Sequence, residues 1–233
     1  MSAVIEFRNV TKRFGERAVL DGMSFSVDKG EIFAMVGPSG TGKSVTLKHI
    51  AGLLEPDAGE VVCESRKIGY LFQSGALLAW LTVWENVALP LVETARLGEK
   101  EVEKRVADAL AAVGLSDDGD KYPSEISGGM QKRAGLARVL VRDADVILYD
   151  EPTSGLDPVT SASISRLIRD VGRSRGATSV LVTHDIASAM RIADRIMLIK
   201  DGKCVLCAAP DKFAASRDPA VVEFIEASRG EGI

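Results

Sequence analysis

The sequence predicts an α/β domain with a mostly parallel core sheet, an N-terminal antiparallel β part and an inserted helical part. Residues 31–37, 145–150 and 179–185 are nearly continuous apolar runs, which are typical of parallel strands covered on both faces. Near the amino terminus, "AVIEFRNV" and "MSFSVDKG" alternate apolar and polar residues as half-buried strands do. Helical patterns lie between Phe72 and Asp145, which places the helical insertion there.

The composition and charge narrow the class of protein. A chain of 233 residues, 46% hydrophobic and 27% charged, fits one globular unit. With 29 basic against 33 acidic residues the formal net charge is -4, which argues against general nucleic-acid binding. No signal-peptide pattern opens the chain and no apolar run reaches transmembrane length. We therefore expect a cytosolic protein or one peripheral to a membrane.

Capping and turn signals place the later elements. Asp157 followed by Pro158 predicts the capped start of a helix. Asp201-Gly202 predicts the turn of a late hairpin, and a helical tail is expected around residues 220–228. Apolar residues at helical spacing mark two helices, one by Val102, Val106, Ala109, Leu110 and Val113, the other by Ile164, Leu167, Ile168 and Val171.

Cys204 and Cys207 form a CxxC pair in "GKCVLCAAP". A zinc site needs a second such pair, and the sequence has none. The run also has the pattern of a short strand, in which residues three apart point to opposite faces. We therefore expect ordinary packing of these thiols rather than metal or redox chemistry.

The segment "GPSGTGKS", residues 37–44, matches a phosphate-binding loop between a strand and a helix. Its glycines let backbone N–H groups turn inward toward phosphate oxygens, and the helix N-terminus adds partial positive charge. Lys43 is placed to reach the β- and γ-phosphates and the Ser44 hydroxyl to ligate Mg²⁺. The alternative is a glycine-rich turn that binds nothing. The flanking strand and helix favour the P-loop NTPase interpretation.

Acidic residues follow the apolar run "VILYDE". Asp150 ends a buried strand, where it can hold Mg²⁺ directly or through water. In an extended chain the side chain of Glu151 diverges from it, so Glu151 can face the attacking water as general base. His184 ends another strand at the same predicted sheet edge, where it can donate to the γ-phosphate or position water. The alternative is two exposed loop acids and a structural histidine; His49 is assigned no role.

The stretch "EISGGMQKRAGLARVL" breaks several rules of a structural helix start. Ser127 is a good N-cap, yet Gly128 and Gly129 weaken the first turn. Lys132 and Arg133 add positive charge near the positive end of the helix macrodipole. We interpret these features as a second anion site on a helix N-terminus. The alternative is a poorly capped surface helix.

These motifs, in this order, resemble the nucleotide-binding subunits of ABC transporters over nearly the whole chain. "GPSGTGKS" resembles the Walker A motif, "VILYDE" the Walker B motif with the catalytic glutamate, and "ISGGMQ" the signature motif. "LFQSG" resembles the Q-loop with Gln73, "SGLD" the D-loop, and His184 the switch histidine. Phe14 occupies the position of the aromatic residue that stacks on adenine.

The resemblance implies an ATP hydrolase that uses Mg²⁺ and dimerises head to tail around two ATP molecules, with the signature motif of each subunit on the γ-phosphate of its partner. It implies catalytic roles for Glu151, His184 and Gln73 and metal roles for Ser44, Gln73 and Asp150. The implied ATP-binding residues are Phe14, Gly37, Pro38, Ser39, Gly40, Thr41, Gly42, Lys43, Ser44, Val45, Ser127, Gly128, Gly129 and Asp157.

Subfamily features resemble ATPases of the Mla/MCE type, which drive phospholipid movement between bacterial membranes. They are Met130, "KRAGLAR", "DEPTSGLDPVTSASI" and "SGALLAWLTVWENVALPL". The implied partners are a second copy of the chain, membrane permease subunits docking near residues 73–92, and an MCE-type substrate-binding protein; no nucleic acid is expected. The implied location is the cytoplasmic side of the bacterial inner membrane. The alternative is an importer ATPase for amino acids or another small solute.

Two other classes fit less well. Soluble ABC proteins that act on ribosomes or DNA usually carry two such domains or long insertions, and this chain has one domain and no basic excess. In a P-loop kinase or GTPase neither the signature motif nor His184 would have a function, which argues against these classes.

The segment "GALLAWLTVWENVALPLV" is apolar but a poor membrane span, because Glu85, Asn86 and Pro90 interrupt it. Trp80 and Trp84 would share a face if both lay on one helix. They belong either to the core of the helical part or to a groove that receives a cytoplasmic helix of a membrane partner.

The expected organisation is a single ABC ATPase domain over residues 1–233. Residues 1–72 and 145–208 form the ATP-binding core with its antiparallel lobe, 73–144 the helical part, and 209–233 a helical tail. The stretch "EPDAGEVVCESRKIGY" is shorter than in the family, which predicts a trimmed antiparallel lobe.

Overall fold

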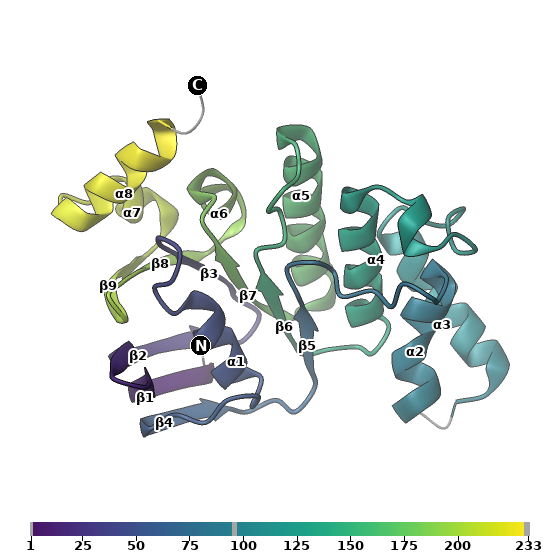
Figure 1. Ribbon diagram of the computed structural model, residues 1–233, viewed down its shortest axis with the longest axis horizontal. Coiled ribbons are helices and arrows are strands. Elements are labelled where there is room, and N and C mark those ends of the chain that lie inside the picture. Colours follow the sequence, from purple (N-terminus) through teal and green to yellow (C-terminus); the bar gives the residue numbers. More distant parts are fainter. Residues whose placement is uncertain (1, 95–96, 231–233) are drawn as a thin grey trace.

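A mixed β-sheet forms the centre of the computed structural model, which describes residues 2–94 and 97–230 (Figure 1). Within those residues six strands join in the order β5-β6-β7-β3-β8-β9, all parallel except β9. Every residue of β3, β6 and β7 is buried, as the apolar runs predict. The strands are β3 (Ile32–Val36), β5 (Ile68–Leu71), β6 (Val146–Asp150), β7 (Thr178–Thr183), β8 (Arg195–Lys200) and β9 (Lys203–Ala208).

The amino-terminal segments form the predicted antiparallel sheet. In the described chain its order is β2 (Arg17–Asp28), β1 (Ala3–Phe14), β4 (Ala58–Cys63). Helix α1 (Lys43–Ile50) packs between the two sheets, because Leu47 and Ile50 share one buried apolar cluster with side chains of β1 and β6. The chain passes from β4 to β5 through residues 64–67 alone.

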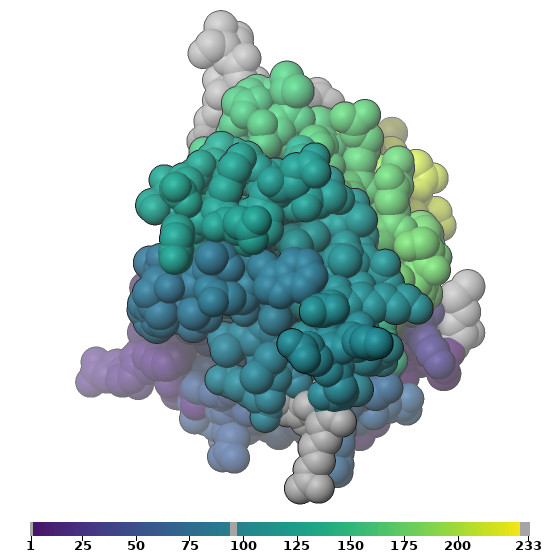
Figure 2. Space-filling view, turned by 90° about the vertical axis from the view of Figure 1, so that its right-hand side faces the viewer, coloured from purple at the N-terminus to yellow at the C-terminus, as the bar shows by residue number. Residues whose placement is uncertain are grey.

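Helices α2 (Val83–Thr94), α3 (Glu99–Ala112) and α4 (Gly128–Leu140) form the inserted helical part, away from the antiparallel sheet (Figure 1). Figure 2 looks onto this side, where the blue and teal surface of the insertion fills the centre of the view. Helix α3 buries Val106, Ala109 and Leu110, as its spacing predicts. A short 3-10 turn, η1 (Pro123–Glu125), precedes α4.

The carboxyl-terminal half contains α5 (Pro158–Arg175), α6 (Ile186–Ile192), α7 (Pro210–Ala214) and α8 (Pro219–Gly230). The predicted cap is confirmed: Asp157 Oδ1 accepts hydrogen bonds from the backbone N–H groups of Val159 and Thr160. The predicted β8–β9 hairpin turns at Asp201 and Gly202, both with positive φ. None of the helices in the described ranges is long and apolar enough to cross a membrane.

The prediction that Cys204 and Cys207 point to opposite faces is wrong. Met197 of β8 pairs with Cys207, and Ile199 pairs with Cys204, so one extra residue, Val205, bulges out of β9. A bulge shifts the alternation by one residue and thereby brings both thiols to the same face. Both are free, half-buried and packed on the core, and burial raises the pKa of Cys204 to about 11.

The two tryptophans do not share a helix face. Trp80 lies in the turn before α2 and its surface is 72% exposed. Trp84 lies on α2, half-buried against the core and close to Gly119. The core interpretation therefore fits Trp84, and Trp80 remains an exposed aromatic side chain.

Candidate nucleotide-binding and catalytic site

The loop of residues 37–42 joins β3 to α1 and needs glycine at two close approaches. A Cβ on Gly37, with φ +151°, would lie 2.3 Å from the carbonyl oxygen of Ile199. A Cβ on Gly42, with φ +99°, would lie 2.9 Å from the carbonyl oxygen of Val19. Gly42 is also the N-cap residue of α1. The N-terminus of this helix therefore lies at the loop, where its backbone N–H groups can bind an anion.

Lys43 is the first residue of α1, and its side chain folds back over the loop. Its Nζ donates hydrogen bonds to the carbonyl oxygens of Gly37 at 2.8 Å and Pro38 at 2.9 Å. The residue is only 6% exposed. Burial lowers the pKa of Lys43, while the nearby carboxylates of Glu151 and Asp150 oppose that shift. A cation is thus held at the centre of the loop, where phosphate oxygens would gather.

Asp150 joins three elements at the carboxyl end of β6. Its Oδ1 accepts a hydrogen bond from Ser44 Oγ at 2.8 Å, and its Oδ2 accepts one from the hydroxyl of Tyr70 at 3.0 Å. Burial, followed by the charge of Asp150, raises the pKa of Tyr70, so the hydroxyl stays protonated and donates. Tyr70 also stacks on Phe72, with ring centroids 4.2 Å apart. Sequence reasoning missed Tyr70, because nothing local shows that β5 lies beside β6.

The predicted metal-binding residues come together. Ser44, Gln73 and Asp150 line one hollow of about 820 Å³. Gln73 Nε2 donates to Ser154 Oγ at 3.3 Å, which leaves its amide oxygen as the candidate ligand atom. Hydroxyl, amide and carboxylate oxygens are hard ligands of the kind that Mg²⁺ prefers, so this donor set fits the ion.

Glu151 and His184 form a pair beside this site. His184 Nδ1 lies 2.8 Å from Glu151 Oε2. The side chain of Glu151 is 14% exposed and that of His184 57% exposed. Glu151 has a positive φ of 48°, so the expectation of an extended chain at this residue is wrong. The backbone N–H of Glu151 donates to Val182 O at 2.9 Å, which ties this left-handed residue to the neighbouring strand β7.

A cavity of about 430 Å³ unites motifs that are far apart in the sequence. Phe14 lies at this cavity with 53% of its surface exposed, which suits a flat ring-stacking role. Val19 also lines it and was not predicted; only the antiparallel sheet brings it beside Gly42. The lining residues are Phe14, Val19, Ser39, Gly40, Gly42, Lys43, Ser44, Val45, Gln73, Glu151 and His184.

The start of α4 lies outside this cavity. Ser127 Oγ accepts a hydrogen bond from Met130 N–H at 3.3 Å, which confirms the predicted N-cap. Ser127 and Gly128 are exposed, whereas Gly129 is buried against Thr160. Among the described residues these three, like the helix cap Asp157, are absent from the lining of the 430 Å³ cavity. The chain's own phosphate loop and its signature segment are therefore separate surfaces.

The cations of α4 do not face an anion at the helix start, which corrects part of the interpretation of the second site. Lys132 is 7% exposed, and its Nζ donates to Ser154 O at 2.6 Å. Arg133 donates to Ser163 Oγ at 3.0 Å. Lys132 is thus bonded to the loop after β6 and Arg133 to α5, so Ser127 to Gly129 are kept as the candidate ligand-binding part of this helix start.

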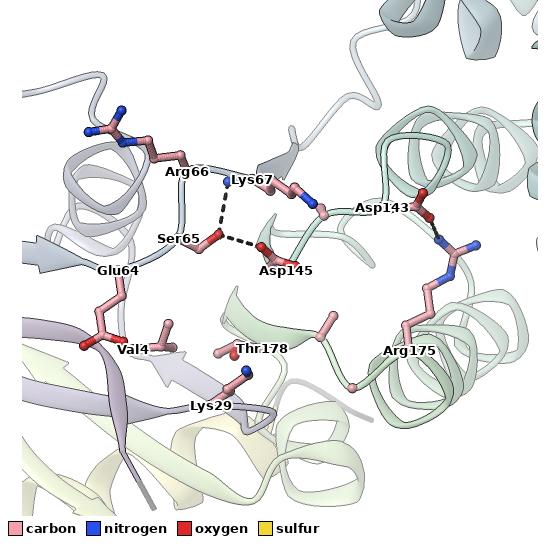
Figure 3. Close-up of a pocket in the computed structure, with 13 residues that line it drawn as sticks. Val4, Lys29, Glu64, Ser65, Arg66, Lys67, Asp143, Asp145, Arg175 and Thr178 are labelled. Atoms are coloured by element: carbon pink, nitrogen blue, oxygen red, sulfur yellow. Dashed lines mark hydrogen bonds and ion pairs between the residues drawn. The ribbon is translucent and has the colours of Figure 1, made fainter. Parts of the chain in front are cut away.

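A further hollow, of about 700 Å³, lies at the opposite edge of the sheet, by the amino ends of β6 and β7 (Figure 3). Ser65 bonds to Asp145 and Asp143 pairs with Arg175 around it (Figure 3). None of the predicted site residues, all of which lie in the described ranges, lines this hollow. The candidate site is thus confined to the carboxyl edge, where parallel sheets bind ligands.

Comparisons with known proteins agree with this geometry. The ABC transporter family profile matches residues 20–154. The chain is 39% identical to a probable ribonucleotide transport ATP-binding protein, mkl, of Mycobacterium tuberculosis, over 98% of this chain and 68% of the relative. It is 37% identical to the intermembrane phospholipid transport system ATP-binding protein MlaF of Haemophilus influenzae, over 96% and 90%. It is 40% identical to the methionine import ATP-binding protein MetN of Brucella abortus, over 85% and 58%.

The fold is also that of solved ATP-binding cassettes. A dimeric cassette bound to ADP and Pi in a post-hydrolysis state superposes with a TM-score of 0.80 at 33% identity, covering 88% of this chain and 98% of that one. The chain belongs to the ABC transporter family and is one of its ATP-binding, ATP-hydrolysing subunits.

Proposed function

We propose that this chain is the ATPase of a transporter that moves phospholipid between membranes. The observation that carries the lipid assignment is the match to MlaF, which extends over 90% of that relative and 96% of this chain. The methionine importer relative has a similar identity but shares only 58% of its own length. An importer of amino acids or another small solute is therefore the second candidate.

ATP would bind in the 430 Å³ cavity. Phe14 would stack on adenine, the backbone N–H groups of residues 37–45 would surround the phosphates, and Lys43 would neutralise the β- and γ-phosphates. Pro38 and Thr41 shape this loop, because Thr41 Oγ1 donates to Pro38 O at 2.9 Å. The ring, the loop and the cation line the same cavity as Glu151 and His184.

Ser44, Gln73 and Asp150 would hold Mg²⁺. When bound, the ion supplies positive charge that stabilises the phosphate oxygens as bonds change. The chain's own part is to aim the ligand oxygens: Ser44 and Tyr70 hold the two oxygens of Asp150 in place, and Ser154 holds the amide of Gln73.

Glu151 would act as the general base. Its carboxylate opens onto the cavity that contains Lys43 and the phosphate loop, so it can accept a proton from the attacking water. His184 would hold Glu151 Oε2 through Nδ1, and its ring, which also lines the cavity, would meet the γ-phosphate.

Ser127, Gly128, Gly129 and Asp157 would act on the nucleotide of a second copy of the chain. Their separation from the chain's own cavity supports this assignment, as does the dimeric state of the solved cassette described above. The helix N-terminus at Ser127 supplies backbone N–H groups suited to a phosphate. Two copies related head to tail would then complete two sites.

The membrane partner would dock near residues 73–92, with an MCE-type substrate-binding protein in the same complex, on the cytoplasmic side of a bacterial inner membrane. The exposed rings of Trp80 and Phe72 support this surface. An aromatic side chain that is 72% exposed is a common anchor of protein interfaces.

Purification of the tagged chain with its membrane partners tests the proposal. ATP hydrolysis by that complex should rise with phospholipid vesicles and stay unchanged with free amino acids. Trp80→Ala should reduce recovery of the partners without changing ATP binding by the chain itself. Stimulation by an amino acid or its binding protein, and not by lipid, would instead assign an importer.

A further inference from the structure

Lys132 is a buried cation whose three hydrogen-bond acceptors all belong to the loop after β6. Its Nζ donates to Ser154 O at 2.6 Å, to Ser154 Oγ at 3.2 Å and to Glu151 O at 3.3 Å. The residue is 7% exposed. A buried ammonium group is costly unless its donors are satisfied, and these oxygens satisfy all three. The pairing therefore fixes where the loop can lie relative to α4.

The loop that Lys132 holds contains a strained residue. Glu151 has a left-handed backbone at φ 48°, which a residue with a side chain keeps only when its surroundings enforce it. Two groups bond its carbonyl oxygen: the backbone N–H of Ser154 at 3.2 Å and Lys132 Nζ. Burial lowers the pKa of Lys132 and the charge of Glu151 opposes that shift, which agrees with a short distance between the two residues.

The same contacts reach the Q-loop. Ser154 Oγ accepts hydrogen bonds from both Lys132 Nζ and Gln73 Nε2, the latter at 3.3 Å. Four motifs that were predicted separately are thus joined inside one chain: the signature helix by Lys132, the Walker B motif by Glu151, the D-loop by Ser154 and the Q-loop by Gln73. Lys132 lies only five positions after Ser127, within the first turns of α4.

We propose that Lys132 is a positioning residue that holds the backbone of Glu151 and couples the start of α4 to this chain's own catalytic carboxylate. The inference rests on the proposed role of Glu151 as general base. The nucleotide of the second copy would bind at Ser127 to Gly129, at the start of α4. Any resulting movement of α4 would also move Lys132, and through its hydrogen bonds Ser154 and Glu151. A signal from one nucleotide site would in this way reach the base of the other.

Substitution of Lys132 separates positioning from binding. Lys132→Met keeps the apolar stem and removes all three donors, whereas Lys132→Arg keeps donors at that place. Lys121→Met is the matched control, because that lysine lies in the same helical insertion and its amine pairs with the carboxylate of Asp118. Lys132→Gln serves as a second variant if Lys132→Met does not fold.

We expect Lys132→Met to lower kcat about tenfold to a hundredfold while the dissociation constant for ATP changes less than about threefold. Lys132→Arg should regain much of the rate, and Lys121→Met should match the wild type. Amide exchange of residues 151–156 should be faster in Lys132→Met. If Lys132 merely stabilised the fold, its substitution would change the melting temperature. It would not speed amide exchange at residues 151–156 or lower kcat without a matching loss of ATP affinity.

A folded Lys132→Met or Lys132→Gln protein with wild-type kcat and unchanged exchange at residues 151–156 would overturn the inference. So would a loss of ATP affinity equal to the loss of rate. Glu151→Gln, measured alongside, keeps the two proposals distinguishable. Full turnover by Glu151→Gln would overturn the proposed base, whereas an inactive Glu151→Gln with a fully active Lys132→Met would overturn only the role of Lys132.

Discussion

His184 Nδ1 lies 2.8 Å from Oε2 of Glu151, at the wall of the cavity that also contains Lys43. The contact joins the end of β7 to the end of β6, two neighbouring parallel strands. The imidazole ring of His184 holds the carboxylate of Glu151 from one side and so fixes its orientation toward the attacking water and the phosphate. We therefore expect rate, and not nucleotide affinity, to depend on this pair.

His184→Ala should lower kcat by about a hundredfold, with the dissociation constant for ATP within about threefold of wild type. The physical reason is that the carboxylate of Glu151 loses its partner while the loop around Lys43 is untouched. Steady-state hydrolysis and fluorescent-nucleotide titration measure the two quantities. Unchanged kcat would remove His184 from the proposed mechanism.

Tyr70→Phe should weaken the use of Mg²⁺. The substitution removes the hydroxyl that holds Asp150 Oδ2 and keeps the ring that stacks on Phe72. Loss of a group that orients a metal ligand typically costs about tenfold or more in metal affinity. We expect the Mg²⁺ concentration for half-maximal ATPase activity to rise by about that factor, while ATP binding in EDTA stays as in wild type. An unchanged Mg²⁺ requirement would show that Asp150 does not depend on Tyr70.

Gly42→Ala should abolish nucleotide binding and destabilise the protein. A Cβ there would lie 2.7 Å from Leu20 Cδ2 and 2.9 Å from Val19 O, at a φ of +99°. Such strain and overpacking cost about 1–3 kcal/mol of folding free energy. Gly98→Ala is the control, because no described atom lies within 4 Å of its added Cβ. Urea unfolding and ATP titration of both variants check the prediction, which fails if Gly42→Ala binds ATP normally.

His49 should make stability depend on pH. Its Nδ1 bonds to Val45 O at 2.7 Å, and its buried Nε2 has no hydrogen-bond partner among the described residues. Burial lowers the pKa of His49, so the unfolded chain binds the proton more readily than the folded one. The contribution of neutral His49 to folding stability is fully present above the pKa of histidine in the unfolded chain, about 6.5. It is lost as the pH falls through the lower pKa of the folded state.

Urea unfolding between about pH 7.5 and about pH 5 measures this dependence. As the pH is lowered, we expect the free energy of unfolding to decrease in the wild type and in His184→Ala. The decrease should be smaller in His49→Gln. The chain has only these two histidines, so the comparison isolates one ring. Equal slopes in all three proteins would contradict the assignment to His49.

The local patterns of the sequence predicted the strands of the core, the phosphate loop and the caps at Ser127 and Asp157. These signals are local because they depend on residue type and spacing within a few positions. Other features depend on which strands become neighbours. Tyr70 meets Asp150 only because β5 pairs with β6, and Lys132 reaches Ser154 only because α4 packs on the loop before α5.

Two local features were also beyond the sequence patterns. The bulge at Val205 reverses the expected faces of Cys204 and Cys207, although their spacing alone predicts the opposite. The left-handed turn at Glu151 occurs at a residue that seldom adopts it, because the packing of the loop enforces that conformation. Such strained positions gather at functional sites, where propensity and structure disagree.

The most direct test of the shared-site proposal is the solution mass of Glu151→Gln with and without Mg·ATP. The substitution should keep nucleotide binding and remove the base, so ATP should stay bound. We expect a monomer without nucleotide and a lasting dimer with Mg·ATP, with hydrolysis nearly lost. A protein that binds ATP and stays monomeric at every concentration measured, alone and with its membrane partners, would contradict the pairing of Ser127 to Gly129 with a second copy's nucleotide.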